Sequence, residues 1–281
     1  MNIVINNLQK AETFAAIFQH IKLMTDNINI MFEKDRMYVQ SMDSARVSIF
    51  EINIPSSWFD AYSHTTDRNI SIGINSSILF KILNARDKNQ VMQIDYDLEE
   101  EDKLFIHFSL LGQASTTTTT SNSVSSKMGD NTSTFDKHFE VPLVDIESEL
   151  LAIPTVDYSV EMALPSTYFA NIVNQLKMFG DTMEIQCSEE KIVLYATSVE
   201  NGKMCVEIKI DDLTAFSIVE GEELKLAFSL MYLHNICMYN KLAKDIELKF
   251  SANYPMRIDY DLGDGAKILY FLAPKMDNDD D

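Results

Sequence analysis

The residues best suited to acid–base or metal chemistry form two acidic runs in this 281-residue chain. The first run consists of Asp95, Asp97, Glu99, Glu100, Glu101 and Asp102, and the second consists of residues 277–281. The first falls in a predicted hairpin turn and the second in a terminal tail, where solvated charge is the usual explanation. The sequence also lacks a phosphate-binding loop, a nucleophile elbow and an HExxH zinc motif.

Histidine and cysteine add no recognisable pattern of metal ligands or nucleophiles. The histidines are His20, His64, His107, His138 and His234, and they show no ligand spacing. The cysteines are Cys187, Cys205 and Cys237, and none forms a CxxC pair. We therefore expect no enzyme, no metal site, no cofactor and a reducing compartment. An enzyme stays the first alternative, and activity of the purified protein that depends on a divalent metal would establish it.

Weak contact with phosphate is the chemistry that the charge distribution indicates. The net charge of −20 opposes nucleic acid on average. Four segments with helical periodicity (10–23, 75–86, 165–178 and 229–242) nevertheless hold six basic residues and a single acid, Glu12. They sum to +5, so the rest of the chain carries −25. Glutamate is a good helix former, so its exclusion indicates faces that lie against a polyanion. Contact with another protein is the alternative explanation.

The elements that present these faces belong to an internal duplication. A helical stripe with the spacing i, i+3, i+4, i+7 is formed by Phe14, Ile17, Phe18 and Ile21. The same stripe recurs 155 positions later in Phe169, Ile172, Val173 and Leu176. The offset holds through the following turn and strand, as far as residues 37–39 and 192–194. Such a long common register indicates two copies of one unit.

Each copy contains a second helix, at 75–86 and 229–242, and alternating strands follow both. The pentapeptide IDYDL occurs at 94–98 and 258–262, but its offset of 164 conflicts with the helices, so we interpret it as coincidence. We predict an α+β fold. Each half should carry two helices on one face of antiparallel sheets built from eight or nine strands.

Domain boundaries follow from the duplication. We expect a first domain over 1–141, a connecting linker over 142–159, a second domain over 160–275 and an acidic tail over 276–281. Residues 112–134 are rich in Ser and Thr with little to bury, which predicts a flexible surface loop. The sequence shows no signal peptide and no apolar run near the roughly 20 residues that cross a bilayer. We expect an intracellular protein without a membrane partner.

Several motifs resemble those of the proliferating cell nuclear antigen (PCNA) family of DNA sliding clamps. The run QSMDS at 40–44, followed by Val47, is similar to the family's first-repeat signature. The run DRN at 67–69, with Gly73, Asn75 and KIL at 81–83, is similar to its DNA-associated segment. The run YFLAPK at 270–275 is similar to its C-terminal signature. The resemblance covers nearly the whole chain apart from residues 112–134.

The resemblance implies a DNA clamp fold that closes as a homotrimeric ring of six domains around duplex DNA, with the helices lining the hole. The implied function is that of a DNA polymerase processivity factor without sequence specificity. The implied partners are double-stranded DNA, two further copies of the chain, a clamp loader, DNA polymerase and other proteins with PCNA-interacting peptides. The residues expected to face DNA are Lys10, His20, Lys22, Arg68, Lys81, Arg86, Asn171, Asn174, Lys177 and Lys241. Relatives commonly have Arg at the positions of Asn171 and Asn174, so we expect a less positive hole.

The resemblance also implies a hydrophobic pocket beneath the linker, which accepts peptides of the Q-x-x-aliphatic-x-x-aromatic-aromatic type. Its residues would be Met42, Arg46, Val47, Ile49, Leu151, Ile153, Tyr254, Pro255, Phe271, Leu272, Ala273 and Pro274. Subunits of the family meet edge strand to edge strand, which removes exposed sheet edges. The expected interface residues are Phe135, Lys137, Phe139, Val141, Lys203, Cys205, Glu207 and Lys209.

A second alternative keeps the fold without the ring, as a monomeric processivity factor that holds DNA on one face. Such a factor needs a strongly basic patch, for which +5 over four helices is small. The Asn- and Ile-rich composition is compatible with a cellular genome or a large DNA virus. We therefore expect the nucleus, or a cytoplasmic viral replication site, as the location.

Overall fold

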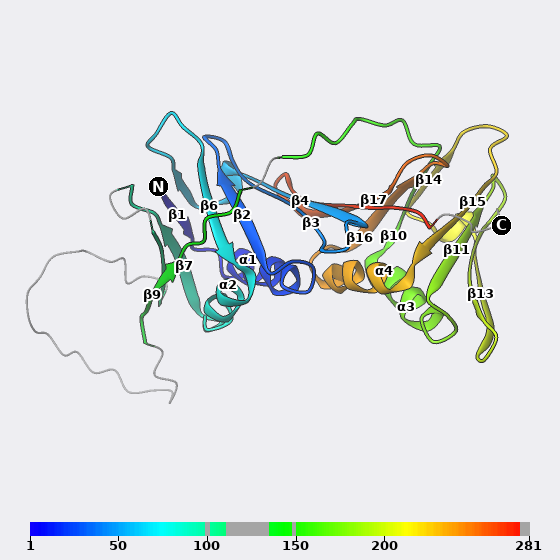
Figure 1. The fold of residues 1–281 in the computed structure, drawn as a ribbon, viewed down its shortest axis with the longest axis horizontal. Helices are drawn as coiled ribbons and strands as arrows, with labels where there is room; N and C mark the ends of the chain where they lie inside the picture. Colours follow the sequence, from blue (N-terminus) through cyan, green and yellow to red (C-terminus); the bar gives the residue numbers. More distant parts are fainter. Residues whose placement is uncertain (99–101, 111–134, 148–149, 276–281) are drawn as a thin grey trace, which may run out of the picture.

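A computed structural model describes residues 1–98, 102–110, 135–147 and 150–275. The predicted loop at 112–134, the acidic tail at 276–281 and the acidic residues Glu99, Glu100 and Glu101 lie outside the described residues. The chain is elongated, with the N-terminus and β1 near one end and β13 and β15 near the other (Figure 1).

Four helices lie where the helical periodicity predicts them. They are α1 (Leu8–Ile21), α2 (Ser76–Leu83), α3 (Ser166–Leu176) and α4 (Leu230–Cys237), and α4 continues into a 3₁₀ turn, η3 (Met238–Lys241). Asn7 and Asn75 cap the first two helices, because their side chains accept hydrogen bonds from first-turn backbone N–H groups. The predicted stripes face inward: Phe14, Phe18, Phe169 and Leu176 are buried.

Each half contains nine strands within the part of the chain that the structure describes. The first half has β1 (Asn2–Ile5), β2 (Asn27–Phe32), β3 (Arg36–Met42), β4 (Ser48–Pro55), β5 (Ala61–Ser63), β6 (Ile70–Asn75), β7 (Gln90–Asp95), β8 (Lys103–Leu110) and β9 (Lys137–Pro142). The second half has β10 (Val160–Pro165), β11 (Thr182–Cys187), β12 (Ile192–Ser198), β13 (Gly202–Ile208), β14 (Ala215–Ile218), β15 (Leu224–Ser229), β16 (Asp245–Phe250), β17 (Met256–Gly263) and β18 (Ala266–Leu272).

The strands form three sheets, and one of them spans both halves. The sheet orders are β5-β1-β7-β8-β9, then β14-β10-β16-β17-β18-β4-β3-β2-β6, then β13-β12-β11-β15. The β18–β4 pair joins the halves with antiparallel pairing from Lys267–Asn53 to Leu272–Ser48. The two halves are therefore connected by backbone hydrogen bonds as well as by the linker.

The duplication is confirmed element by element. β2 and β11 lie 155 residues apart at both ends, and α2 and α4 lie 154 apart. The strand orders also correspond, since β5-β1-β7-β8-β9 matches β14-β10-β16-β17-β18, and β6-β2-β3-β4 matches β15-β11-β12-β13. The two IDYDL copies begin in β7 and in β17, whereas the counterpart of β7 is β16. The interpretation of that pentapeptide as coincidence is therefore confirmed.

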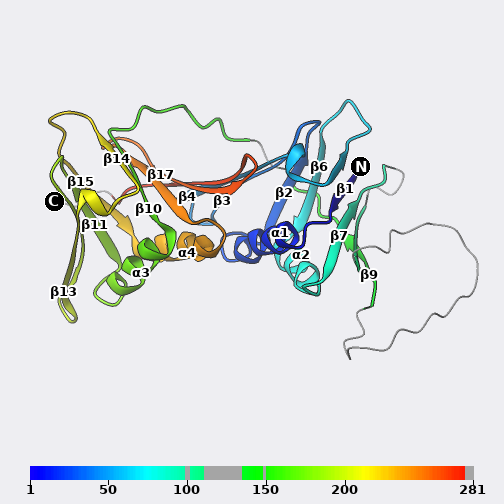
Figure 2. The ribbon, with the colours of Figure 1, turned by 180° about the vertical axis from the view of Figure 1, so that it is seen from behind.

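The helices and the linker lie on opposite sides of the molecule. In Figures 1 and 2 the four helices run along one long side, while the segment between β9 and β10 arches over the other. Across the centre, Tyr239 of η3 donates a hydrogen bond to the Ile17 carbonyl, so the helix layers of both halves are in contact. Among the described residues, no helix has the length and apolarity to cross a membrane.

Candidate nucleic-acid interface and partner surfaces

The helix side is poor in acid, as the sequence predicts. Glu12 is the one acidic residue within α1, α2, α3, α4 and η3. Lys22 and Lys177 occupy the C-caps of α1 and α3, where a cation interacts favourably with the helix dipole. Part of the basic character of this side therefore has a helix-stabilising explanation, whereas the absence of acid does not.

A polar hollow of about 390 Å³ opens where the helix layers of the two halves meet. Its walls are Gln19, His20, Ala170, Asn174, His234, Cys237, Met238, Asn240 and Lys241. The Asn174 amide oxygen lies 2.7 Å from Nδ1 of His234, which links α3 to α4. Amide, imidazole and ammonium groups can all donate hydrogen bonds to phosphate oxygens. Three residues expected to face DNA, His20, Asn174 and Lys241, are thus gathered in one hollow.

The two imidazoles of this hollow are neutral at physiological pH. Burial, and then the charges of Lys22 and Lys241, lower the pKa of His20. Burial, and then the charge of Lys177, lower the pKa of His234. The hollow therefore presents polar donors and one ammonium, that of Lys241.

Lys81, Asn171 and Lys177 are exposed on the helices, and the Lys22 ammonium lies 3.7 Å from the centre of the Phe80 ring. This cation–π contact holds Lys22 between α1 and α2. Together with the hollow, these residues form a polar strip along the helix side, which we call the helix surface.

Three residues expected to face DNA have other roles in the structure. The ammonium of Lys10 is bound by the Trp58 carbonyl at 2.8 Å and by Asp264 at 2.7 Å, so it joins the two halves. Arg68 precedes β6 while α2 follows it, which puts Arg68 roughly 20 Å from the helix surface at the rise of a β-strand. Sequence shows the charge of Lys10 but not the groups that its ammonium binds, and a DNA contact of Lys10 or Arg68 stays a prediction.

Arg86 is the third such residue. Its guanidinium is half-buried in the turn after α2 and donates to the carbonyls of Gln90, at 2.7 Å, and Asp87, at 3.1 Å. Burial lowers the pKa of Arg86 and the nearby Glu12 and Asp87 partly offset this effect. The side chain fixes a loop, and its expected place on the DNA-facing surface is not supported.

The outer face of the central sheet carries the residues expected for a peptide pocket. Met42, Ile49 and Phe271 form one cross-strand row, because Met42 pairs with Ile49 and Ile49 pairs with Phe271. Arg46, Tyr254 and Pro255 are exposed near the row's end, and Val47, Ile153, Ala273 and Pro274 are partly exposed. Ala273 extends the row's edge by donating its N–H to the Val47 carbonyl at 3.0 Å. Leu272 is different: its side chain is fully buried on the helix side of β18, so it belongs to the core. Its placement in the pocket was wrong because strand neighbours point to opposite faces.

The linker is held over this face by a glutamine that sequence reasoning missed. The Gln40 side chain accepts the Leu151 N–H at 2.7 Å and donates to the Leu151 carbonyl at 3.0 Å. The Leu151 side chain remains exposed. Gln40 thus fixes the linker backbone and leaves the apolar Leu151 side chain beside the row. We call Gln40 and Leu151 together the linker clamp.

A buried carboxylate, Asp43, shapes the turn at the end of the row. Its oxygens accept backbone N–H groups from Ala45, Val47 and Ser48, and the Tyr232 hydroxyl of α4 at 3.0 Å. Burial alone raises the pKa of Asp43, but the hydrogen bonds outweigh it and hold that pKa below its usual value. The turn is therefore tied to the second half of the chain.

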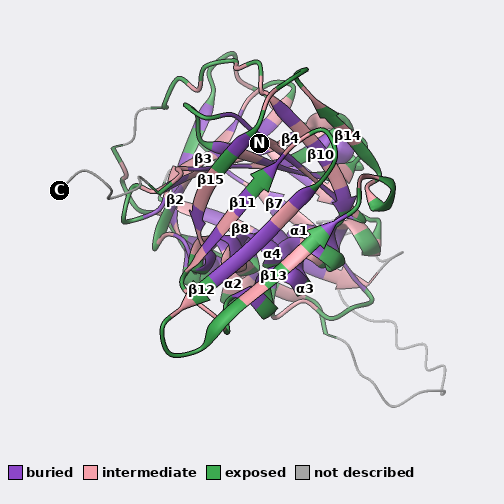
Figure 3. Cartoon of the chain, turned by 90° about the vertical axis from the view of Figure 1, so that its right-hand side faces the viewer, coloured by how far each residue is buried: buried purple, intermediate pink, exposed green. Residues whose placement is uncertain are grey.

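The two strands expected at subunit contacts are sheet edges. β9 ends the five-stranded sheet and β13 ends the four-stranded one. Figure 3 views the molecule from the side on which β13 lies. Lys203, Cys205, Glu207 and Lys209 are exposed there, and Phe135 is 69% exposed before β9. Their carbonyl and N–H groups on the open side need a partner or water.

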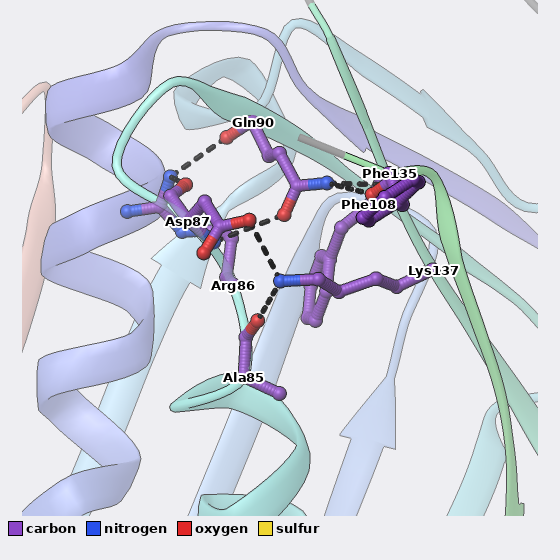
Figure 4. A network of polar contacts seen from close by, with 7 residues as sticks. All are labelled: Ala85, Arg86, Asp87, Gln90, Phe108, Phe135 and Lys137. Carbon is purple, nitrogen blue, oxygen red and sulfur yellow. Dashed lines mark hydrogen bonds and ion pairs between the residues drawn. The ribbon is translucent and has the colours of Figure 1, made fainter. Parts of the chain in front are cut away.

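Three expected interface residues have side chains that point inward from that open edge. The Lys137 ammonium reaches back to the Ala85 carbonyl at 2.6 Å and to Asp87 at 2.8 Å (Figure 4). In the same network Gln90 donates to the Phe135 carbonyl at 2.7 Å, which fixes the start of β9. Val141 is fully buried, and the Phe139 ring packs at 5.6 Å from Phe108. The side chains of Lys137, Phe139 and Val141 are thus inward-facing, and only their backbone belongs to the edge.

The sequence places Gln19, His234 and Asn240 on polar, acid-poor helix faces that can lie against phosphate, and all three line the hollow. It does not indicate Tyr232, which completes the Asp43 turn. Tyr232 had no such signal, because its hydroxyl partner is 189 residues away. Across the described ranges, no single chain brings three or more His, Cys, Asp or Glu side chains together as a metal site.

Comparison with known families accounts for both halves. Residues 4–128 match the model of the proliferating cell nuclear antigen N-terminal domain. Residues 152–275 match the model of the proliferating cell nuclear antigen C-terminal domain. Proteins of this family are non-enzymatic sliding clamps that act as processivity factors in DNA replication. With two matched domains and antiparallel sheets backed by four helices, the chain belongs to the PCNA family of sliding clamps.

Proposed function

We propose that three copies of this chain close into a ring around duplex DNA, with the helix surface facing the DNA and the linker side facing outward. The observation that carries this proposal is the pair of open edges at β9 and β13. Within the chain their counterparts, β18 and β4, pair with each other. Pairing β9 with β13 of the next copy repeats that junction and leaves neither edge open.

The internal junction also supplies a register for the junction between copies. The two halves can be aligned strand by strand through their pairing registers, starting from β7 with β16 and from β2 with β11. In this alignment Val141 corresponds to Leu272 and Ile208 corresponds to Ile54. All four side chains are buried, which supports the alignment. Phe271 pairs with Ile49 in the chain, and the corresponding pair between copies is Glu140 with Lys203. These opposite charges face each other in the proposed ring.

Sliding on DNA suits a surface whose contacts are few and weakly charged. Phosphate contacts are independent of base sequence, and strong ones would slow movement along the duplex. The exposed Lys81, Lys177 and Lys241 and the polar side chains of the hollow provide such contacts. Retention would then be topological.

The test compares retention on closed circular and linear DNA after loading. A ring stays on circles and slides off open ends, whereas a monomer that holds DNA on one face is retained equally on both. Light scattering supplies the assembly state: three times 32.0 kDa supports the ring, and a mass near 32.0 kDa contradicts it.

We further propose that the row Met42–Ile49–Phe271 and the linker clamp bind aromatic peptides of replication proteins. An apolar row beside an exposed Leu151 suits a short helix with aromatic anchors. Leu151→Ser should weaken such a peptide at least several-fold by calorimetry without lowering the melting temperature, because the side chain is exposed. Unchanged affinity would place the pocket elsewhere. Nuclear residence is typical of the family, and we propose it for this chain as well.

A further inference from the structure

Two histidines outside the DNA-facing and peptide-binding surfaces lie side by side on the outer face of β8 and β9. His107 and His138 are cross-strand partners, and their Nδ1 atoms are 2.6 Å apart. At this distance one Nδ1 donates a proton and the other accepts it. A change of tautomer at the donor would direct two lone pairs at one point, which is the arrangement that a divalent transition metal requires.

The surroundings of His107 favour the tautomer that carries the proton on Nε2 and a lone pair on Nδ1. Its Nε2 lies 3.7 Å from Asp95, whose carboxylate is held by Asn2 at 2.6 Å and by Gln93 at 2.8 Å. At 3.7 Å this contact is electrostatic and not a hydrogen bond, and the carboxylate beside Nε2 favours a proton there and leaves Nδ1 as the ligand.

The proposed ring adds a third ligand to this pair. Within the chain Leu269 pairs with Glu51. In the alignment of the two halves that matches Val141 with Leu272, His138 corresponds to Leu269 and Cys205 corresponds to Glu51. Cys205 of the next copy would therefore lie directly opposite His138. Directly opposite residues on one sheet face have Cβ atoms about 4.5–5.5 Å apart. α2 packs on β9 and α3 packs on β13. In a shared sheet with the helices on one side, the opposite faces of β9 and β13, which carry His138 and Cys205, form one continuous face.

We propose that His107 and His138 of one copy and Cys205 of the next form a Zn²⁺-class site at each subunit boundary. This inference rests on the proposed ring. The three ligands are two neutral imidazoles and one thiolate, with water as the fourth, which is a tetrahedral donor set that zinc accepts. His138 moves its proton to Nε2, and the Cys205 thiol releases one proton to solvent on binding. The metal then bridges two copies and holds the ring closed.

The test uses Co²⁺ as a spectroscopic probe on the full chain, with the mass in solution measured alongside. The trimer should bind one Co²⁺ per copy, with tetrahedral visible bands and a thiolate-to-cobalt band in the near ultraviolet. His138→Gln should abolish binding and Cys205→Ser should remove the thiolate band. His234→Gln, a histidine change on the helix surface, is the matched control and should leave the spectrum unchanged.

Mixing the variants tests whether the ligands come from different copies. Neither Cys205→Ser nor His138→Gln alone gives the thiolate band, but a mixed ring contains intact boundaries. Random mixing should restore about a quarter of the wild-type band, since both members of each heterologous boundary must be correct. Zn²⁺ should also slow dissociation of the diluted wild-type ring about tenfold or more and leave the Cys205→Ser ring unchanged.

Failure of this inference differs from failure of the ring. A trimer whose Co²⁺ spectrum is the same in wild type and His138→Gln overturns the metal site and leaves the ring intact. A thiolate band that survives Cys205→Ser, or a mixture that restores nothing, overturns the assignment of Cys205. A monomeric chain overturns the shared site together with the proposed ring.

Discussion

Single residues fix the linker above the central sheet, and Gln40 is the clearest case. Its amide uses both an acceptor and a donor on the backbone of Leu151, 111 positions away. Each such bond contributes about 0.5–1.5 kcal/mol, reduced here by solvent exposure. The linker has no strand or helix of its own in its described residues. A two-point bond of this kind therefore decides where the linker lies.

Gln40→Leu should release the linker without unfolding the domain. We expect faster amide exchange at Leu151 and neighbouring linker residues by hydrogen-exchange mass spectrometry, and weaker binding of aromatic peptides. Gln186→Leu is the matched control, because Gln186 lies on a strand of the other half and bonds Tyr195 instead. Equal exchange in both variants would contradict a clamping role for Gln40.

Asp43 links a turn of the first half to α4 of the second. Because its pKa is lowered in the folded protein, its contribution to stability is present above the ordinary carboxyl pKa of about 3.9 and is lost as pH falls below it. Asp43→Asn should reduce stability at neutral pH by about 1–3 kcal/mol, because the turn's N–H groups lose a charged acceptor.

The check on Asp43 is thermal unfolding at several pH values. The difference between wild type and Asp43→Asn should shrink as pH drops from about 5 to about 3, by the linkage just described. Tyr232→Phe removes only the contact between the halves and should cost about 1 kcal/mol. Asp67→Asn in an exposed loop is the control. A constant difference between Asp43→Asn and wild type across this range would contradict a lowered pKa of Asp43 in the folded protein.

At the scale of elements, periodicity located all four helices, and the common offset paired the halves correctly. The helix ends differ from prediction by a few residues, because caps such as Asn7 and Asn75 end the pattern locally. The side-chain assignments lack support where a hydrogen-bond or ion-pair partner decides the orientation of the side chain. Lys10, Arg86 and Lys137 are bonded to carbonyls or carboxylates that sequence spacing does not reveal. Leu272 failed because its face is set by the alternation in β18.

The histidine pair is a second case in which sequence spacing does not reveal which residues are neighbours. The spacing of 31 residues between His107 and His138 suggests no ligand pattern, yet the β8–β9 register makes them neighbours. Cys205 can join them only through a second copy. Sites assembled from paired strands need the register, and here the duplication supplies it.

The β9–β13 register makes a prediction about the ring. Glu140→Lys puts a positive charge opposite Lys203 of the next copy at every boundary, and it also removes the ion pair that Glu140 forms with Lys103 within the chain. A like-charge pair on a sheet costs a few tenths to about 1 kcal/mol. With three boundaries, the trimer should dissociate at clearly higher protein concentration in sedimentation experiments.

Charge exchange is the decisive control for that register. Combining Glu140→Lys with Lys203→Glu restores opposite charges between copies and should recover most of the lost trimer stability. Glu140→Lys with Lys209→Glu makes the same change of net charge outside the proposed pair and should not. Recovery by both double variants would mean that net charge, and not this pairing, sets assembly.

At the scale of the whole molecule, the charge distribution decides how the ring holds DNA. The chain carries −20, and its helix surface offers few cations. Binding that neutralises Z phosphates falls with salt at a slope of about −0.9Z, so proteins with 6–10 phosphate contacts lose roughly 10³–10⁵ in affinity between 50 and 200 mM salt. A ring held by topology should instead stay on closed circular DNA over that range, with only its sliding rate changed.

Lys81→Glu with Lys177→Glu separates topology from affinity. The double variant should keep the mass of the trimer and its retention on circles, because encirclement does not depend on these side chains. It should shorten the products made by a polymerase on a long template, since a repulsive helix surface misaligns the duplex in the hole. Lys191→Glu with Lys225→Glu, on exposed residues away from the helices and the subunit edges, is the control for net charge. Loss of the trimer in the first variant alone would mean that Lys81 and Lys177 face a neighbouring subunit instead of DNA. Loss of retention on circles with the trimer intact would mean that charge, and not closure, holds the clamp on DNA.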